Sequence, residues 1–274
     1  MKHFCEKVHE SIRSILEICL LLFVFFLPHI INATKLIEMC FNNTTLNFDN
    51  VKYYLLLQLG NWIIGLLLLL YVLHIFRKMN KEKLLNNRNV YHDYSYFWYW
   101  FSSKILGYKK CNMKLVPIFM QYKLVLNDTF EDFYVGSDDD YSIKENEQID
   151  IKKINYDLIS DEINLVLADT YPIIENQLPI IKKELSTIII SRNNNDFNRY
   201  FSPEFIVNIV NEVRNLPINV NAINTYATTN PKHTLKIAQD VFKLAERGNI
   251  KKLVVFQQSK DGLRKFGSKG ITIF

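Results

Sequence analysis

Two apolar stretches within the first 80 residues, over 15–33 and 53–76, constrain the fold of this chain most strongly. A helix needs about 20 apolar residues to cross a hydrocarbon core of roughly 30 Å. The second stretch exceeds that length and contains no formally charged side chain. We therefore predict a transmembrane helical hairpin over residues 1–80, with the lipid bilayer as a partner.

Basic residues beside the two stretches predict the orientation of the hairpin. Lys and Arg near the ends of a span stay on the cytoplasmic side, and they cluster outside the hairpin loop, as Lys2, Lys7 and Arg13 before it and Arg77, Lys78, Lys81, Lys83 and Arg88 after it. We expect both termini to be cytoplasmic, in a bacterial inner or plasma membrane. The first stretch also has the features of a secretory signal peptide, but its cleavage leaves the C-terminal part on the same side.

Polar amides inside the second stretch predict helix–helix contacts. Gln58 and Asn61 lie one turn apart, and amides in hydrocarbon usually form hydrogen bonds between helices. We consider two partners for these amides. One is a second copy of the chain, through the face that carries Asn61, and the other is the first span, where His29 and Asn32 are also polar.

Residues 81–152 are predicted to form a juxtamembrane aromatic and basic segment followed by an acidic linker. Eight of the eleven residues from Tyr91 to Phe101 are aromatic, which is typical of a segment at the water–lipid boundary. An aromatic sheet packed on the soluble part and a surface for stacking nucleic-acid bases are the alternatives. Residues 114–125 are expected to form one or two strands. The net charge of +5 is modest, so nucleic acid is not an expected partner.

Residues 153–274 alternate between β-branched apolar runs and segments with helical period, which predicts an α/β domain. Near-continuous apolar runs indicate strands that are buried on both faces of a mostly parallel sheet. Helix starts are signalled at Ser202-Pro203-Glu204 and Asn230-Pro231. The expected strands are Ile163–Ala168, Thr187–Ile190, Val220–Ile223, Leu253–Phe256 and Ile271–Phe274. The sequence therefore predicts a cytosolic, Rossmann-like three-layer domain.

Polar residues follow each of the four main strands, where parallel sheets bind their ligands. We predict that Arg192 and Lys260 pair with a phosphate or carboxylate and that Tyr171 or Tyr226 stacks on a ring. Asp169 is expected to accept hydrogen bonds from hydroxyls or to hold a metal. The full set of candidate ligand-binding residues is Asp169, Thr170, Tyr171, Ser191, Arg192, Thr225, Tyr226, Lys232, His233, Gln257, Ser259 and Lys260.

Common enzyme motifs match this domain poorly. The sequence contains no GxGxxG after the first strand, no GxxxxGK[ST] and no Gly-x-Ser-x-Gly. Asp169 and Ser191 stand where haloacid-dehalogenase-like phosphotransferases have catalytic residues, but Tyr171 replaces their second aspartate. No carboxylate stands out as the catalytic Glu of a TIR-type glycohydrolase. His233 is the single histidine after Lys153. We assign no catalytic residue, cofactor or metal site, and a metal at Asp169 is considered only as the alternative to hydroxyl binding.

In layout the chain resembles bacterial two-helix membrane effectors of antiphage and stress systems, in which a cytosolic nucleotide-sensing domain acts on an attached membrane segment. The resemblance implies a membrane-anchored sensor/effector that binds a small anionic, nucleotide-like ligand and signals to its transmembrane helices. A membrane-tethered enzyme that processes nucleotides or phosphates and a non-catalytic membrane scaffold are the alternatives.

Overall fold

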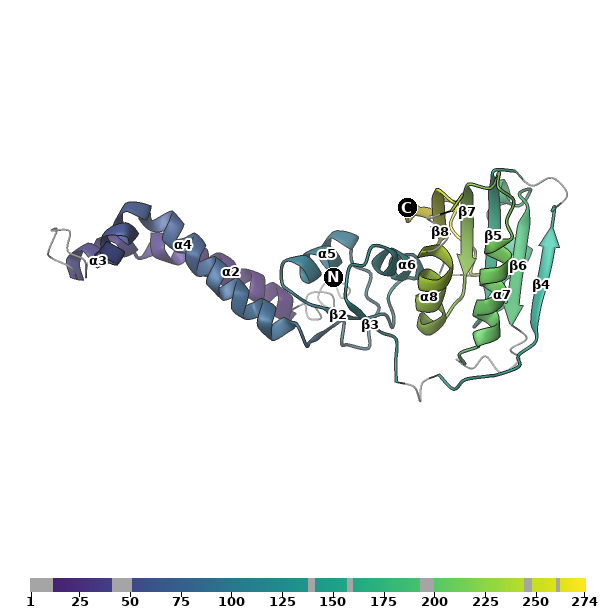
Figure 1. The fold of residues 1–274 in the computed structure, drawn as a ribbon, viewed down its shortest axis with the longest axis horizontal. Coiled ribbons are helices and arrows are strands. Elements are labelled where there is room, and N and C mark those ends of the chain that lie inside the picture. The colour runs from purple at the N-terminus through teal and green to yellow at the C-terminus, as the bar shows by residue number, and fades with distance from the viewer. Residues whose placement is uncertain are drawn as a thin grey trace. The chain divides into compact units, whose positions relative to one another are not determined.

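The chain divides into two compact units in the computed structural model (Figure 1). The first unit comprises Met1–Leu84 with Trp100–Lys109, and the second comprises Leu85–Tyr99 with Lys110–Phe274. The backbone therefore passes from one unit to the other three times. The structure describes residues 12–40, 51–137, 141–156, 160–192, 200–243, 248–259 and 262–274, without the side chains of residues 53, 54 and 56.

The first unit contains the helices α2 (Ile12–Ile30), α3 (Ala33–Cys40) and α4 (Val51–Asn80). Two of its helical segments, Ile12–Ile30 and Leu57–Asn80, are long and apolar enough to cross a membrane. Large apolar side chains such as Phe23 and Leu70 are exposed along them, as expected of helices whose outer faces contact lipid. The prediction of two apolar N-terminal helices is confirmed.

Close packing and polar contacts hold α2 against α4. A Cβ atom on Gly65 would collide with the backbone oxygen of Phe25, so the helices approach closely there. Asn61 donates to Asn32 Oδ1 (3.2 Å), and its own Oδ1 accepts from the backbone N–H of Thr34 (2.9 Å). Of the two partners considered for Asn61, the structure therefore shows the one inside the hairpin. Self-association through this face stays a prediction.

A short helix and a small sheet lie between the hairpin and the main sheet in the sequence. The helix α5 spans Tyr96–Lys104, and the strands β1 (Leu84–Leu85), β2 (Lys110–Asn112) and β3 (Asp132–Tyr134) form a sheet in the order β1-β2-β3. The expectation of strands over residues 114–125 is wrong, because the helix α6 (Ile118–Leu126) occupies this region. Its Tyr122 and Val125 lie three residues apart and join the main core, so tertiary packing overrides the local β preference of the sequence.

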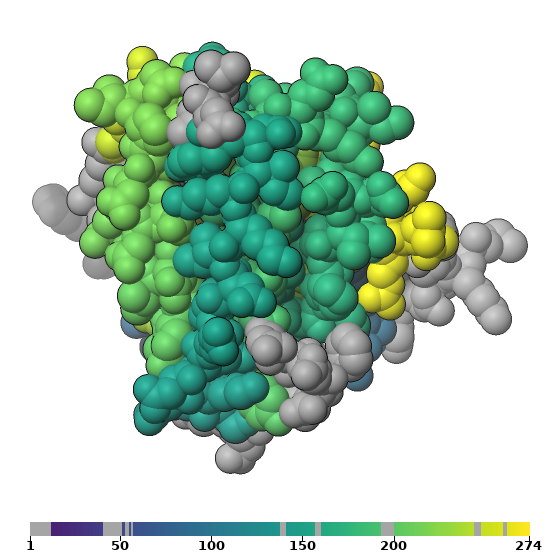
Figure 2. Space-filling model, turned by 90° about the vertical axis from the view of Figure 1, so that its right-hand side faces the viewer, coloured from purple at the N-terminus to yellow at the C-terminus, as the bar shows by residue number. Residues whose placement is uncertain are grey.

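The second unit is built on a six-stranded mixed sheet. Its strands are β4 (Ile149–Ile154), β5 (Glu162–Ala168), β6 (Thr187–Arg192), β7 (Ala222–Ala227), β8 (Lys252–Phe256) and β9 (Ile271–Thr272). Their order is β4-β6-β5-β7-β8-β9; the central four are parallel, and β4 and β9 are antiparallel edges. The mixed α/β architecture with a mostly parallel sheet is thus confirmed. The edge strand β4, which runs across the face in Figure 2, begins within the stretch that was expected to be a linker.

The two faces of this sheet are covered differently. The helices α6, α7 (Pro203–Arg214) and α8 (Pro231–Ile237), with the π-helical turn η4 (Ala238–Phe242) that continues α8, bury one face. On the other face, Tyr226 stacks on Phe256. Between β5 and β6 the described chain contains two 3₁₀ turns, η2 (Glu175–Gln177) and η3 (Ile180–Lys182), and no α-helix. Pro172 and Pro179 interrupt this connection, and proline disfavours a helix interior.

Candidate functional site

A crevice lies beyond the carboxyl ends of β5, β7 and β8, where the sequence predicts a ligand site. The chain leaves β5 for one face of the sheet and β7 for the other, which is the topological switch point at which open α/β sheets bind ligands. The crevice has a volume of about 360 Å³ and is lined by Tyr91, Ile118, Thr170, Tyr171, Ala227, Thr228, Thr229, Gln257, Gln258, Ser259 and Arg264.

Hydrogen bonds between the ends of β5 and β7 fix the floor of the crevice. The backbone N–H of Thr170 donates to Thr228 O (3.2 Å), and the hydroxyl of Thr170 donates to the same oxygen. In return, Thr228 Oγ1 donates to Tyr171 O (2.8 Å). These contacts preorganise the floor, which lowers the entropy that a ligand has to overcome on binding.

An aromatic ring and a guanidinium group form one wall. Tyr171 is 46% exposed, and the Arg264 guanidinium carbon lies 4.7 Å from the centre of its ring, in a cation–π contact. The turn that carries Arg264 is held in place by Gln177, whose side chain donates to Leu263 O (2.9 Å). Arg264 was not predicted from the sequence, because the turn after β8 has no recognisable motif.

Gln257 carries an unused hydrogen-bond acceptor. Its Oε1 atom is buried and has no partner among the residues that the structure describes. A buried acceptor without a hydrogen bond is unfavourable, so this amide is a place in the crevice wall where a further hydrogen bond would be stabilising.

Three of the predicted site residues form a buried ionic network beneath the strand ends. The Arg192 guanidinium contacts Asp169 Oδ1 (2.5 Å) and both carboxylate oxygens of Glu147 (2.8 and 3.2 Å). The side chains of Arg192 and Asp169 are fully buried, and that of Glu147 is 2% exposed. Burial alone raises the pKa of Asp169, but His233 and Arg192 outweigh it, so the pKa lies below its usual value. The pKa of Glu147 is also lowered, since its bonds to Arg192 and Ser202 outweigh its burial.

His233 belongs to the same network. Its Nε2 accepts a hydrogen bond from the backbone N–H of Ser202 (2.9 Å), so this nitrogen carries no proton. The proton is on Nδ1, which faces Asp169 Oδ2 at 2.7 Å. Asp169 Oδ2 also accepts from the backbone N–H of Asn230 (2.9 Å). Both ring nitrogens are thus engaged in structural contacts, and neither is presented to a substrate.

The structure separates the predicted site residues into distinct groups. Thr170, Tyr171, Gln257 and Ser259 line the crevice, whereas Asp169, Arg192 and His233 lie beneath it. Thr225 and Tyr226 are fully buried in the strand β7, on opposite faces of the sheet. Ser191 lines a separate hollow, and Lys232 lies over the ring of Phe201 (5.2 Å). Lys260 lies outside the described residues.

The buried network removes the expected ligand roles of Asp169 and Arg192. The Arg192 guanidinium donates to Glu147, to Asp169 and to Tyr200 O, and its side chain is fully buried, so it is not presented to a phosphate in the crevice. Both oxygens of Asp169 likewise have partners, which also argues against the nucleophile of a haloacid-dehalogenase-like enzyme. No group of three potential metal-ligating side chains occurs in the described part of the chain.

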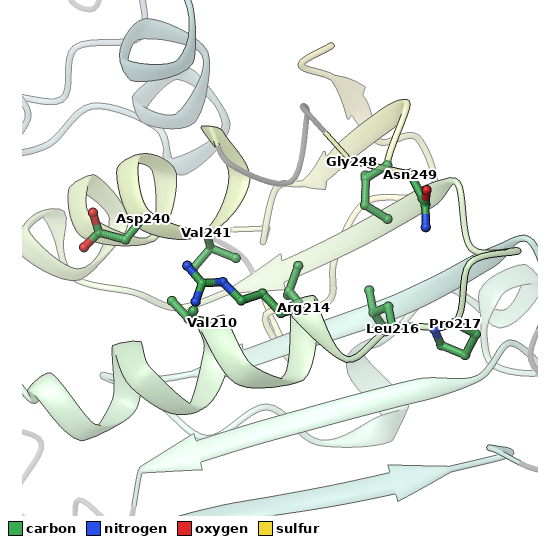
Figure 3. Close-up of a pocket in the computed structure, with 10 residues that line it drawn as sticks. Val210, Arg214, Leu216, Pro217, Asp240, Val241, Gly248 and Asn249 are labelled. Atoms are coloured by element: carbon green, nitrogen blue, oxygen red, sulfur yellow. The ribbon is translucent and has the colours of Figure 1, made fainter.

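A third hollow lies at the opposite, amino-terminal ends of β7 and β8 (Figure 3). It has a volume of about 250 Å³, and Arg214 extends into it from the last turn of α7 toward Val241. None of the predicted site residues lines it. Arg214 therefore offers a matched control for Arg264, because both arginines line a hollow in the same unit.

Comparison with known proteins gives one match over the whole chain. A model of the "SMODS- and Ubiquitin system-associated 2TM effector domain" matches residues 1–274. No curated protein shows significant similarity. Two structures of the Acinetobacter baumannii SAVED/CARF-domain containing receptor Cap4 are partly similar: one with the cyclic trinucleotide 3'3'3'-cAAA (8% identity, TM-score 0.40) and one with 2'3'3'-cAAA (10%, 0.39). These matches cover 61% and 64% of this chain but only 39% and 40% of the receptor chains.

Proposed function

Since the chain belongs to the family of SMODS- and ubiquitin-system-associated 2TM effector domains, we propose that it is a membrane-anchored sensor/effector. In this proposal, the crevice beyond β5, β7 and β8 binds a small anionic, nucleotide-like ligand. Binding then signals to the transmembrane helices, in a bacterial defence or stress setting. The α/β unit is a Rossmann-like domain in the cytosol, and both termini are on the cytoplasmic side of the inner membrane.

The contact between Tyr171 and Arg264 is the observation that carries this proposal. An exposed aromatic ring offers a stacking surface for a nucleobase, worth about 1–3 kcal/mol per base in single-stranded nucleic-acid sites. Among the described residues that line the crevice, Arg264 is the one that carries a charge, and a guanidinium recognises phosphate well. A ligand that carries both an aromatic base and an anionic group therefore complements Tyr171 and Arg264.

The polar groups on the other walls support the same ligand class. Hydroxyls of Thr229 and Ser259 and the side-chain amides of Gln257 and Gln258 line the crevice. These groups hydrogen-bond to sugar hydroxyls and to the edges of bases. Because the Oε1 atom of Gln257 has no partner among the described residues, a ligand with an N–H donor is favoured.

The path of the backbone gives binding a direct route to the membrane unit. The chain passes between the units at 84/85, 99/100 and 109/110, so a change in the α/β unit acts on the other unit through three covalent connections. A ligand shifts the state of the membrane helices only by as much as its affinity differs between the two states. The proposal therefore requires two states of the full-length protein with different ligand affinities.

A membrane-tethered enzyme is the second candidate, and the described geometry favours it less. A general base must reach the substrate proton directly or through one water, but both nitrogens of His233 and both oxygens of Asp169 are engaged in the network below the crevice. A membrane scaffold remains as the third candidate and requires no ligand in the crevice.

A thermal-shift screen of the full-length protein in detergent tests the proposal. Mononucleotides, cyclic oligonucleotides and sugar phosphates are added in turn, and each stabilising ligand is recovered for mass analysis. We expect a nucleotide to raise the melting temperature and to be recovered unchanged. We expect the shift to be lost in Arg264→Gln and retained in Arg214→Gln. Recovery as a product would identify an enzyme, and the absence of any shift would favour the scaffold.

A further inference from the structure

The helix α5 presents an aromatic and basic face that neither the hairpin nor the ligand crevice explains. Tyr99 and Ser102 are fully buried on one side of this helix. On the other side, Phe97 is 66% exposed and Trp100 is 39% exposed. Lys104 is exposed on the same side, because residues three, four and seven positions apart share one helix face.

The C-terminal end of α5 is fixed to the end of the membrane helix α4. Arg77 donates to Lys104 O (3.0 Å), and Asn80 donates to Leu106 O (3.0 Å). Gly107 has φ +83°, and a Cβ atom there would lie 2.7 Å from the Cα atom of Arg77. The chain after α5 therefore lies directly against the last turn of α4.

A buried polar cluster extends this attachment to α2. Asn80 is fully buried and donates to Glu17 Oε2 (2.8 Å), and its Oδ1 accepts from Arg13 (3.1 Å). Arg13 also pairs with Glu17 (3.1 Å). One asparagine thus joins both membrane helices to the segment that follows α5, so that α5 ends at a defined height along the hairpin.

The length of α4 and its basic last turn place the C-terminal end of α5 at the membrane surface. The helix α4 is interrupted at Gly60, whose φ is +73°. Its continuous part, from Asn61 to Asn80, corresponds to about 30 Å at 1.5 Å per residue, which matches the hydrocarbon thickness of about 30 Å. Arg77 and Lys78 occupy its last turn, so the end of α4 lies among the lipid headgroups.

We infer that the face of α5 formed by Phe97, Trp100 and Lys104 binds the headgroup region of an anionic lipid leaflet. This leaflet is the one from which α4 emerges. Trp and Phe side chains favour this boundary, and cations such as Lys104 and Arg77 are attracted to anionic headgroups. None of the three residues of this face lines the ligand crevice, so lipid binding at this face is independent of the proposed ligand.

Two single-tryptophan variants of the full-length protein test this inference. Trp62→Phe with Trp98→Phe leaves Trp100, and Trp62→Phe with Trp100→Phe leaves Trp98. The two positions lie about 200° apart on α5 by the helical period, so Trp98 is a matched control on another face. The proteins are placed in nanodiscs of phosphatidylcholine and phosphatidylglycerol whose acyl chains carry bromine either near the headgroup or near the chain end.

We expect bromine near the headgroup to quench Trp100 at least about twofold more strongly than Trp98, since interfacial helices bury their apolar face at this depth. For Trp100, quenching by bromine near the chain end should be the weaker of the two. Equal quenching of Trp98 and Trp100, or no quenching of Trp100, would overturn the inference. Quenching of Trp100 that appears only on dilution to one protein per disc would instead identify a second copy as the partner of this face.

A spin-label measurement keeps the inference testable if the tryptophan changes disturb the hairpin. After replacement of the native cysteines by serine, a nitroxide is attached at Phe97→Cys or, as the control, at the exposed position Asp93→Cys. We expect the nitroxide at position 97 to collide more often with lipid-soluble oxygen than with a water-soluble nickel complex. At position 93 we expect collisions with the nickel complex to be the more frequent. The same collision ratio at both positions would contradict an interfacial face.

Discussion

Replacing Arg192 by methionine is predicted to destabilise the α/β unit strongly. The substitution removes the cation from a network in which the side chains of Asp169 and Glu147 are 0% and 2% exposed. Asp169 and Glu147 then lose their shared guanidinium, and Asp169 keeps His233 (2.7 Å) while Glu147 keeps Lys144 (3.5 Å). Removal of one member of a buried ion pair typically costs 3–5 kcal/mol.

The expected change in melting temperature follows from this free energy. For a domain of 150–250 residues, 1 kcal/mol corresponds to a shift of roughly 2–4 °C. Arg192→Met is therefore expected to lower the melting temperature by roughly 6–20 °C. Near-ultraviolet circular dichroism of the full-length protein in detergent follows the loss of tertiary packing on heating.

Lys243→Met provides the matched control. Lys243 pairs with Asp128 at 2.6 Å, a distance similar to those in the network, but the two side chains are 37% and 70% exposed. Exposed pairs contribute about 0–1 kcal/mol, so the control should shift the melting temperature by less than roughly 4 °C. Equal shifts in melting temperature for Arg192→Met and Lys243→Met would refute the view that burial makes this network contribute more to stability than an exposed ion pair.

Neutralising the whole network separates charge from packing. Adding Asp169→Asn and Glu147→Gln to Arg192→Met leaves no buried carboxylate without a counterion. We expect this triple variant to recover part of the lost stability, because replacing a complete buried ion pair costs less than removing one partner. A triple variant that is less stable than Arg192→Met would show that hydrogen-bond geometry, and not charge, dominates the effect.

Three further predictions concern pH, a glycine and the hairpin. Because the pKa values of Asp169 and Glu147 are lowered in the folded state, the stability from these groups is complete above their unfolded values of about 3.9 and 4.3. It is lost as the pH falls from there through the lowered folded values; acid titration of the melting temperature should show this loss in the wild type and a smaller one in Asp169→Asn with Glu147→Gln. Gly107→Ala should destabilise the protein more than Gly262→Ala, since both glycines have positive φ but only Gly107 is crowded by Arg77; equal melting temperatures would contradict the close approach to α4. Asn61→Leu should weaken the hairpin by roughly 0.6–2 kcal/mol, because Asn61 bonds to Asn32 and Thr34; if the predicted self-association uses this face, a cross-linked dimer is lost as well, and an unchanged cross-linked oligomer would contradict that prediction.

Elements with strong local signals could be predicted from the sequence. The apolar hairpin follows from composition, and the helix α7 follows from Ser202-Pro203, since the Ser202 hydroxyl accepts from the backbone N–H of Phe205 (3.3 Å). The parallel strands follow from their apolar runs, although β7 begins at Ala222 and not at Val220. The helix α6 was mistaken for strands because its sequence is rich in β-favouring residues, and only its packing on the core decides between the two.

The site was predictable in position but not in detail. The rule for parallel sheets indicates the carboxyl ends of the strands, and Thr170, Tyr171, Gln257 and Ser259 line a crevice there. The sequence does not show which polar residues are already paired. Glu147, which neutralises Arg192, lies 45 positions away in the chain, and Arg264 reaches Tyr171 from a turn that follows another strand.

Photo-crosslinking with an azido-purine nucleotide tests most directly whether the crevice is the ligand site. The full-length protein is irradiated with the probe and digested, and the labelled peptides are identified by mass spectrometry. We expect labelling at Tyr171 or within residues 257–264, reduced by an excess of unlabelled nucleotide and by Arg264→Gln but not by Arg214→Gln. Labelling confined to the hollow around Arg214, or labelling that unlabelled nucleotide does not reduce, would contradict a ligand site in the crevice.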